Sequence, residues 1–451
     1  MRPLLLAALL VMPSAGAAQS LSVPAESYKL KNGLTVVIHE DHSSPVVSVN
    51  VWYHVGSGRE AVGRRGFAHL FEHMMFQGSA NVGDDQHFQL VQDAGGTLNG
   101  STNTDRTNYF ETVPSNYLER VLWLEADRMG WLLDAITQAK LDNQRDVVKN
   151  ERRQNYENRP YGLAGIRTNE LLYPPDHPYH WPTIGYQEDL SAASLDDVKG
   201  FFRTWYAPNN ASLVVAGDVN PAEVRRLVER YFGPIPAGSP VKRMAPRPAE
   251  LGNAVRETLE DRVTLARLNL AWPAAEDWHR DAAPLSVLAT ILGGGKTGRL
   301  NERMVYREQA AQSVNVFANP AQAAGTFSVV VTAREGASLS HLEREVDEEL
   351  ARLAIEGPTA AELEQAITRT EATFVYALAS VAGKSDRLNR YATFRGKPDL
   401  FNEDLARYRR VTAADVKRVA GKYLVNRPRV AVSVVPNGRR DLEARPAEAT
   451  P

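Results

Sequence analysis

The second half of this 451-residue chain repeats the pattern of the first half. Residues 197–199 read Asp-Val-Lys and precede an aromatic pair and an apolar run at 213–216. Residues 415–417 read the same and precede the apolar run 430–435, about 218 residues further on. The run that ends at Trp52 is repeated at nearly the same separation, in residues 268–272. Such a constant separation indicates an internal duplication rather than a chance likeness of amphipathic elements.

Each half is predicted to combine strands with helices. Residues 34–38 and 46–55 are rich in β-branched side chains and predict two paired strands. Residues 117–133 and 140–156 show helical periodicity with charged outer faces. Because strands and helices do not alternate regularly, we expect an α+β fold of two homologous α/β-layered domains. Each would have a mixed or antiparallel sheet with helices packed on it.

Length and composition set the domain organisation and exclude some functions. A chain of 451 residues exceeds one ordinary core. We expect an N-terminal domain at 25–232, a linker rich in proline and glycine at 233–250, and a C-terminal domain at 251–437. A polar, frayed tail would follow at 438–451. The net charge of -2 gives no electrostatic case for nucleic acid.

The first residues have the pattern of a secretory signal peptide. A basic start precedes an apolar run at 3–12 and small residues that end at Ala18, so residues 1–18 are expected to be removed. The run is too short to span a membrane, and no later stretch is long enough. The chain has no cysteine and therefore no disulfide. We expect a bacterial protein released into the periplasm, the alternative being an uncleaved membrane anchor.

One short apolar stretch contains His69, Glu72 and His73, which form the H-x-x-E-H pattern of inverted zinc peptidases. Four residues separate the histidines, so on a helix both imidazoles lie on one face and can bind one metal ion. Glu72 lies beside the same site and can act as a general base without being a ligand. The alternative, two structural histidines in an apolar helix, would bury polar groups at a high cost.

Such a site needs a third protein ligand and an open place for water. The helix predicted at 140–156 offers Glu151, and Glu157 follows directly after it. Local sequence does not decide between these two glutamates.

Several further segments accompany the zinc pattern in order: 95–99, 107–109, 145–151, 177–179 and 217–218. With them, the mature chain resembles the pitrilysin/insulinase family of inverted zinc metallopeptidases in its short two-domain form. The resemblance implies half of a clamshell that binds one Zn²⁺ per chain. It also implies that Glu151, 78 residues after His73, is the third ligand, and that Glu157 is a solvated helix residue.

The resemblance further implies how substrate is bound. In the family, a peptide adds as a strand to a sheet edge beside the zinc, and Leu98, Asn99 and Gly100 occupy that edge here. Asn99 would orient the peptide, the alternative being a turn residue next to Gly95 and Gly96. Gln144 stands where the family often has a glutamate that supports the ligands, so we expect a neutral second-sphere residue.

The second half departs from the family at two positions. Active members carry an Arg and a Tyr that grip the substrate near the zinc, and Val305 and Gln312 stand at those places. The resemblance therefore implies a heterodimer in which a homologous partner subunit supplies the pair. The alternatives are that Arg303 or Tyr306 takes over through a local shift, or that a homodimer works without the pair.

These observations predict a periplasmic zinc endopeptidase that cleaves peptides or small unfolded polypeptides. The alternatives are a non-catalytic peptide-binding or scaffold subunit and a metal-dependent hydrolase of another amide bond. The glycine run at 293–295 lacks the spacing of a phosphate-binding loop, so we expect a loop between helices instead of a nucleotide site.

Overall fold

The computed structural model describes residues 21–445, so the signal peptide expected at 1–18 lies outside the described residues. The first half contains six strands, namely β1 (Glu26–Lys29), β2 (Thr35–Glu40), β3 (Val46–Tyr53), β4 (Thr97–Thr102), β5 (Thr107–Pro114) and β6 (Ala211–Gly217). Its α-helices are α1 (Phe67–Met74), α2 (Gln86–Asp93), α3 (Leu118–Trp131), α4 (Gln138–Arg152), α5 (Ala164–Leu172), α6 (Gln187–Ala192), α7 (Leu195–Trp205) and α8 (Pro221–Phe232). A π-helix, η4 (Arg153–Glu157), continues α4.

The second half repeats the order of elements from β2 to β6, with a π-helix in place of α2. Its strands are β7 (Val255–Asp261), β8 (Arg267–Ala274), β9 (Ala311–Pro320), β10 (Gly325–Ala333) and β11 (Val430–Pro436). Its α-helices are α9 (Ala282–Gly293), α10 (Leu339–Glu356), α11 (Ala360–Ala377), α12 (Val381–Arg395), α13 (Phe401–Arg409) and α14 (Ala413–Tyr423). A 3₁₀ turn, η6 (Gly295–Thr297), and a π-helix, η7 (Asn301–Arg307), follow α9, so the glycine run lies between helices as predicted.

The two sheets share one topology, which confirms the duplication. The first runs β1-β2-β6-β3-β5-β4 and the second β7-β11-β8-β10-β9. Without β1 the two orders correspond strand for strand. Only β2–β6 and β7–β11 are parallel pairs, and the other neighbours are antiparallel. The edge strands β4 and β9 therefore occupy equivalent positions.

The expected pairing of 34–38 with 46–55 is wrong. β6, from the far end of the first half, lies between them and places Val215 opposite both Ile38 and Val49. Both strands are almost wholly buried. Their continuous apolar pattern predicts that both faces of each strand are covered, but it does not predict which strand pairs with which. The turn alternative for Asn99 is also wrong, because this residue lies within β4.

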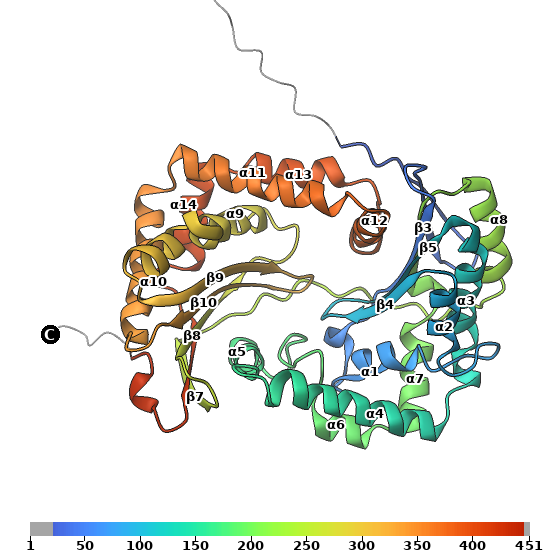
Figure 1. The fold of residues 1–451 in the computed structure, drawn as a ribbon, viewed down its shortest axis with the longest axis horizontal. Helices are drawn as coiled ribbons and strands as arrows, with labels where there is room; N and C mark the ends of the chain where they lie inside the picture. Colours follow the sequence, from blue (N-terminus) through green and yellow to red (C-terminus); the bar gives the residue numbers. More distant parts are fainter. Residues whose placement is uncertain (1–20, 446–451) are drawn as a thin grey trace, which may run out of the picture.

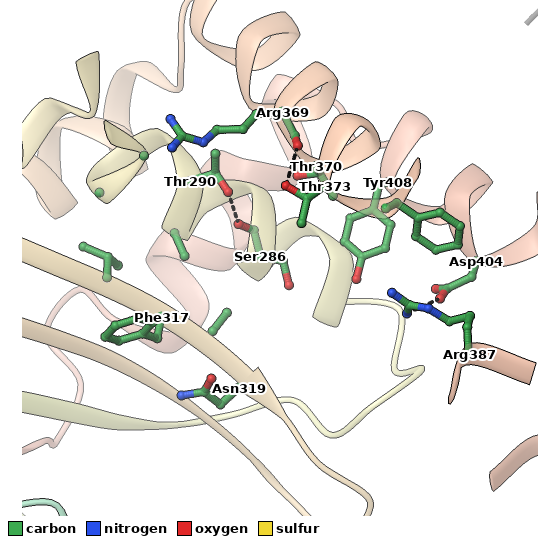
Figure 2. Close-up of a pocket in the computed structure, with 16 residues that line it drawn as sticks. Ser286, Thr290, Phe317, Asn319, Arg369, Thr370, Thr373, Arg387, Asp404 and Tyr408 are labelled. Atoms are coloured by element: carbon green, nitrogen blue, oxygen red, sulfur yellow. Dashed lines mark hydrogen bonds and ion pairs between the residues drawn. The ribbon is translucent and has the colours of Figure 1, made fainter. Parts of the chain in front are cut away.

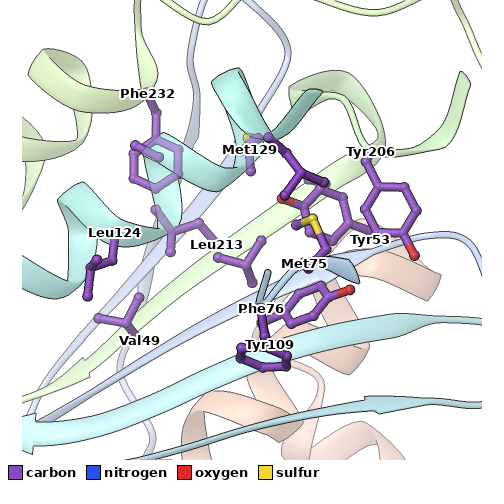
Figure 3. Close-up of a cluster of buried hydrophobic side chains, with 14 of the residues drawn as sticks. Val49, Tyr53, Met75, Phe76, Tyr109, Leu124, Met129, Tyr206, Leu213 and Phe232 are labelled. Carbon is purple, nitrogen blue, oxygen red and sulfur yellow. The ribbon is translucent and has the colours of Figure 1, made fainter. Parts of the chain in front are cut away.

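Each sheet has its own hydrophobic core under its own helices, but one helix of each half crosses over. Figure 3 shows the first core, where Tyr53 and Tyr109 from the sheet meet Met75 and Phe76 just after α1. In the exchange, α5 packs on β11 and β8 of the second sheet, whereas α12 packs on β6 and β3 of the first (Figure 1). Asn389 on α12 donates from Nδ2 to the carbonyl of Asn50 on β3, at 2.7 Å. The exchanged helices bind the two halves into one body.

The linker and the tail are both fixed to this body. The linker has no regular secondary structure from 239 to 250, and Arg247 N donates to the carbonyl of Ala323 at 2.6 Å. The tail expected to fray from 438 is packed as far as 445, because Ala444 is buried and its N–H donates to Ser433 Oγ at 3.0 Å. Among residues 21–445, no helix combines the length and the apolar character needed to cross a bilayer.

Candidate active site and metal centre

Helix α1 presents the three polar residues of the motif on one side and an apolar face on the other. Phe67, Leu70, Phe71 and Met74 are buried in the first core. The helix starts after Gly66, whose φ of 99° is a left-handed conformation that favours glycine.

A buried glutamate ahead of the helix satisfies its first backbone donors. Glu60 accepts hydrogen bonds from Gly66 N at 2.8 Å and from Ala68 N at 2.7 Å. Trp181 Nε1 also donates to it, at 3.1 Å. These hydrogen bonds satisfy the first free N–H groups of the helix and partly offset the burial that raises the pKa of Glu60 to about 8, so Glu60 fixes where α1 begins. Glu60 is not predicted from the sequence, because an acid six residues before the N-cap Gly66 matches no short capping pattern.

The third group of the predicted metal site comes from α4. His73 Nε2 lies 3.3 Å from Glu151 Oε2, and His69 Nε2 lies 3.7 Å from the same oxygen. Ligand atoms around a tetrahedral zinc ion with bonds of about 2.0–2.1 Å are separated by about 3.3–3.4 Å. The two imidazole-to-carboxylate separations are therefore close to those around one zinc ion, and the three ligand atoms all lie within 4.8 Å of one another. Glu157, the other candidate, instead accepts from Arg152 Nε at 3.0 Å and from Gln187 Nε2 at 3.0 Å.

The charge states of these groups also suit a divalent cation. Burial, with His73 as a further cause, lowers the pKa of His69 to about 4. Its imidazole is therefore neutral at pH 7 and offers a lone pair. The imidazole of His73, whose Nε2 lies 3.3 Å away, lowers the pKa of Glu151, so this carboxyl is ionised. Among the described residues, His69 Nδ1 is buried and has no hydrogen-bond partner.

Glu72 leans away from the ligand cluster toward β4. Thr102 Oγ1 donates to Glu72 Oε2 at 2.6 Å. Burial raises the pKa of Glu72, and the Thr102 hydrogen bond opposes that rise. A Cβ placed on Gly100 would lie 3.0 Å from Glu72 Cγ, so the absence of a side chain there lets β4 approach the base closely. Thr102 is not predicted from the sequence, because it lies 30 residues from Glu72 and meets it only through the fold.

The predicted substrate-binding residues lie on a free sheet edge. β4 is the last strand of its sheet, and its only strand partner is β5. Leu98 is half-buried, Asn99 is exposed, and Gly100 faces Glu72. Asn99 Oδ1 accepts from Gly100 N at 2.8 Å. The free edge and the candidate base are therefore adjacent.

Gln144 lies on α4 two turns before Glu151, and its side chain is buried. Its Nε2 donates to Asn143 Oδ1 at 3.4 Å. Since this contact leads to a neighbour on α4, a second-sphere role for Gln144 stays a prediction.

The second half has a pocket of about 400 Å³ at the position equivalent to the metal site. On α9, Ser286, Ala289 and Thr290 have the spacing of His69, Glu72 and His73 on α1. Figure 2 shows Ser286 and Thr290 near Thr370 and Thr373 of α11, the counterpart of α4. Hydroxyl and methyl groups replace the imidazoles and the acids, so this pocket lacks the donor set of the first site.

The sequence is similar to known proteins along nearly the whole chain. The sequence model of the insulinase family (peptidase family M16) matches residues 35–165, and that of the peptidase M16 inactive domain matches residues 192–370. The zinc protease PqqE of Helicobacter pylori is 30% identical over 428 residues, which cover 93% of this chain and 94% of that protein. The chain belongs to the insulinase (M16) family. The mitochondrial-processing peptidase subunit beta of Blastocladiella emersonii is 24% identical over 92% of this chain and 90% of that protein.

Solved structures of the family have the same fold. A protease from Helicobacter pylori superposes with a TM-score of 0.85 at 27% identity and covers 92% of this chain and 100% of its own. The periplasmic protease PqqL of Escherichia coli reaches a TM-score of 0.77 at 18% identity, over 95% of this chain and 49% of that one. The predicted α+β half-clamshell of two homologous domains is thereby confirmed.

Val305 and Gln312, which the family resemblance aligns with an Arg and a Tyr, both lie in the second half. Val305, in η7, packs against the second core, and Gln312 is exposed at the start of β9. Arg303 lies within 3.4 Å of four carboxylates, those of Glu308, Glu345, Glu348 and Glu349. The guanidinium of Arg303 is therefore held in ion pairs with these carboxylates, whereas the side chain of Tyr306 is half exposed.

Proposed function

We propose that this protein is a periplasmic zinc endopeptidase that hydrolyses peptides or small unfolded polypeptides. The observation that carries the proposal is the convergence of His69, His73 and Glu151, with Glu72 between this cluster and a free strand edge. Relatives named zinc proteases support the same kind of activity. The periplasmic location rests on the signal-peptide pattern of residues 1–18.

The side chains divide the chemistry between them. When bound, zinc supplies a Lewis acid that polarises a water molecule and the scissile carbonyl. Glu72 accepts a proton from the attacking water and returns it to the leaving amine. The raised pKa of Glu72 lies closer to neutral pH than that of an ordinary glutamate, which suits a group that both accepts and donates a proton. Thr102 holds the carboxylate in place through its 2.6 Å hydrogen bond.

Substrate binding follows from the free edge of β4. An extended peptide would add as a further strand, through backbone hydrogen bonds that demand little of its sequence. The small Gly100 lets that strand lie close to Glu72. Asn99 would fix the peptide's direction from the exposed side of β4. The same geometry favours unfolded polypeptides, because most strands of a folded protein are already paired on both sides and its edge strands are few.

We further propose that a homologous partner subunit completes the active site. Val305 cannot donate a hydrogen bond, and Arg303 is held by its four carboxylates. The relative from Blastocladiella emersonii is itself named a subunit, and this chain spans about half of PqqL. The scaffold alternative has the match to an inactive-domain model in its favour, but that match covers residues 192–370, beyond the zinc motif.

Chelation and the two neighbouring glutamates test the proposal. Purified protein, assayed on a quenched peptide library with and without a homologous partner, should lose activity on chelation and regain it with zinc. Glu151→Gln should lose both zinc and activity, whereas Glu157→Gln, the matched control six residues further on, should keep both. Activity that survives chelation, or equal zinc loss in the two variants, would overturn the assignment.

A further inference from the structure

The C-terminal domain contains a second group of metal-ligand side chains, far along the sequence from the first. Glu308 follows η7, and His341 and Glu345 lie one turn apart on α10. We propose that these three residues bind a second divalent metal ion of the zinc class. The ion would join the segment after η7 to α10.

The distances within this group fit a metal better than hydrogen bonds. His341 Nε2 lies 3.5 Å from Glu308 Oε2 and 3.4 Å from Glu345 Oε1. Hydrogen bonds from nitrogen to oxygen are shorter, at about 2.7–3.2 Å. Ligand atoms around a tetrahedral zinc are about 3.3–3.4 Å apart. His73 and Glu151, in the first site, have almost the same separation, 3.3 Å.

Glu345 supplies an independent reason to expect a ligand. Its side chain is 0% exposed, and neither of its carboxyl oxygens accepts a hydrogen bond from an N–H group among the described residues. Arg303 Nε lies 3.2 Å from Glu345 Oε1, but its N–H donates to Glu308 Oε1 at 2.9 Å. A buried carboxylate without a donor is costly, and a cation beside it would remove that cost.

The local charges leave room for another cation. Arg303 is shared among four carboxylates. Arg352 adds an ion pair only to Glu349, at 3.3 Å, and Arg344 only to Glu348, at 3.9 Å. Burial and a hydrogen bond to Glu308 raise the pKa of Glu345 to about 8. The two carboxyl groups thus share one guanidinium and one proton, and a divalent ion would take the place of that proton.

The site is open to solvent on one side. The side chains of His341 and Glu308 are 40% and 31% exposed, and a polar cavity of about 510 Å³ lined by Arg303, Glu308 and Glu349 adjoins them. A hydrated ion can therefore enter. On its inner side the site is closed by the buried carboxyl group of Glu345. An ion that binds there would therefore replace some of its water ligands with protein ligands.

A similar group in the N-terminal domain also has a buried, unpartnered carboxylate oxygen, on Glu111, but it differs in its solvent access and its ion pairing. His87, Glu111 and Glu125 also bring one imidazole and two carboxylates together. Their side chains are at most 3% exposed, and Arg128 Nη2 donates to both glutamates. That group is an internal ion pair closed to solvent, so we assign no metal to it.

The donor set selects the class of ion. One imidazole and two carboxylates suit Zn²⁺ or Mn²⁺, whereas Ca²⁺ takes six to eight oxygen ligands. Arg344 Nη2 lies 2.8 Å from His341 Nδ1. A metal on Nε2 puts the ring proton on Nδ1, so Arg344 must turn away, and its exposed side chain can do so toward Glu348. Removing this arginine should therefore tighten binding.

The experiment uses the full chain with the first site disabled by His69→Ala and His73→Ala. Equilibrium dialysis and calorimetry with Zn²⁺ should then find one bound equivalent, and zinc should raise the melting temperature. Adding His341→Ala or Glu308→Gln should weaken this binding more than about 100-fold, beyond the effect of losing an outer-sphere partner. Arg344→Gln should strengthen it.

His279→Ala is the matched control, since this partly exposed histidine also faces an aspartate but lies outside the group. It should leave the second equivalent unchanged. Circular dichroism would confirm that each variant is folded. Absence of saturable zinc binding in the His69→Ala, His73→Ala protein would overturn the proposal, as would binding that survives both His341→Ala and Glu308→Gln. Neither result depends on peptidase activity.

Discussion

Glu72 and its two neighbouring histidines leave the same side of α1, but they meet different partners. The imidazoles turn toward Glu151 on α4, and the carboxylate turns toward Thr102 on β4. One helical turn thereby separates metal binding from proton transfer. The hydroxyl of Thr102 donates a hydrogen bond to the carboxylate and so favours its ionised form, against the burial that raises its pKa.

Thr102→Val should move the acidic limb of the pH profile upward. The Thr102 hydrogen bond lowers the pKa of Glu72, so its loss raises that pKa further above the ordinary value. Glu72 must be ionised to accept a proton, and kcat/KM would therefore begin to fall at a higher pH than in the wild type. The measurement is kcat/KM from pH 5 to 9. Ser101→Ala is the control, since Ser101 Oγ donates to Asn108 instead; equal shifts in both variants would refute this role.

Among single residues, the sequence predicted those that belong to the zinc motif or to the family pattern. His69, Glu72 and His73 were found from spacing, and Glu151 came from the family resemblance. Glu60 and Thr102 were not found, because each reaches α1 through the fold from a segment with no motif of its own. Gln144 remains a prediction, since its amide contacts Asn143 in the structure.

Among the elements, α1 depends most on what precedes it. The helix has only eight residues, and Glu60 satisfies two backbone donors at its first turn. Short helices gain little from their own propensity, so tertiary contacts hold this one in place. The position of both histidines thus depends on Glu60.

Glu60→Ala should destabilise the protein by about 2 kcal/mol or more, because it leaves buried N–H groups without an acceptor. Zinc affinity should fall as well, since α1 would no longer begin at a fixed residue. Urea unfolding and competitive zinc titration provide the measurements. Glu26→Gln, which alters only an exposed pair with Arg225, should change stability by less than about 1 kcal/mol. Wild-type stability in Glu60→Ala would exclude the capping role.

Helix positions were predictable from sequence, but strand neighbours were not. The helices expected at 117–133 and 140–156 appear as α3 and α4, within a few residues, because charged outer faces mark them. The strands β2 and β3 carry apolar residues on both faces, and that pattern does not reveal that β6 lies between them.

In the whole molecule, the duplication explains both the symmetry and the division of labour. Equivalent helices α5 and α12 cross to the opposite sheets and bind the halves together (Figure 1). Amphipathic periodicity indicates that a helix has an apolar face but not which sheet covers that face. The exchange of α5 and α12 could therefore not be predicted from the sequence. The two halves keep equivalent edge strands, β4 and β9, but only the first has the ligand set of the H-x-x-E-H motif.

The purified chain alone should bind zinc and cleave peptides slowly. Adding a homologous subunit that lacks the zinc motif but carries the Arg and Tyr should raise kcat/KM by about 10²-fold or more, the scale of one transition-state donor. Titration of the partner at fixed chain concentration measures the effect. Full activity of the isolated chain, unchanged by the partner, would rule out the heterodimer.

The most direct test of the central claim compares the zinc content and the turnover of Glu72→Gln. Glutamine keeps the shape of the side chain but cannot accept the proton, and Glu72 is not one of the ligands that meet at Glu151. The variant should retain the wild-type zinc content and lose kcat by at least about 10²-fold. Turnover near the wild-type rate, or loss of zinc together with activity, would contradict the assigned roles.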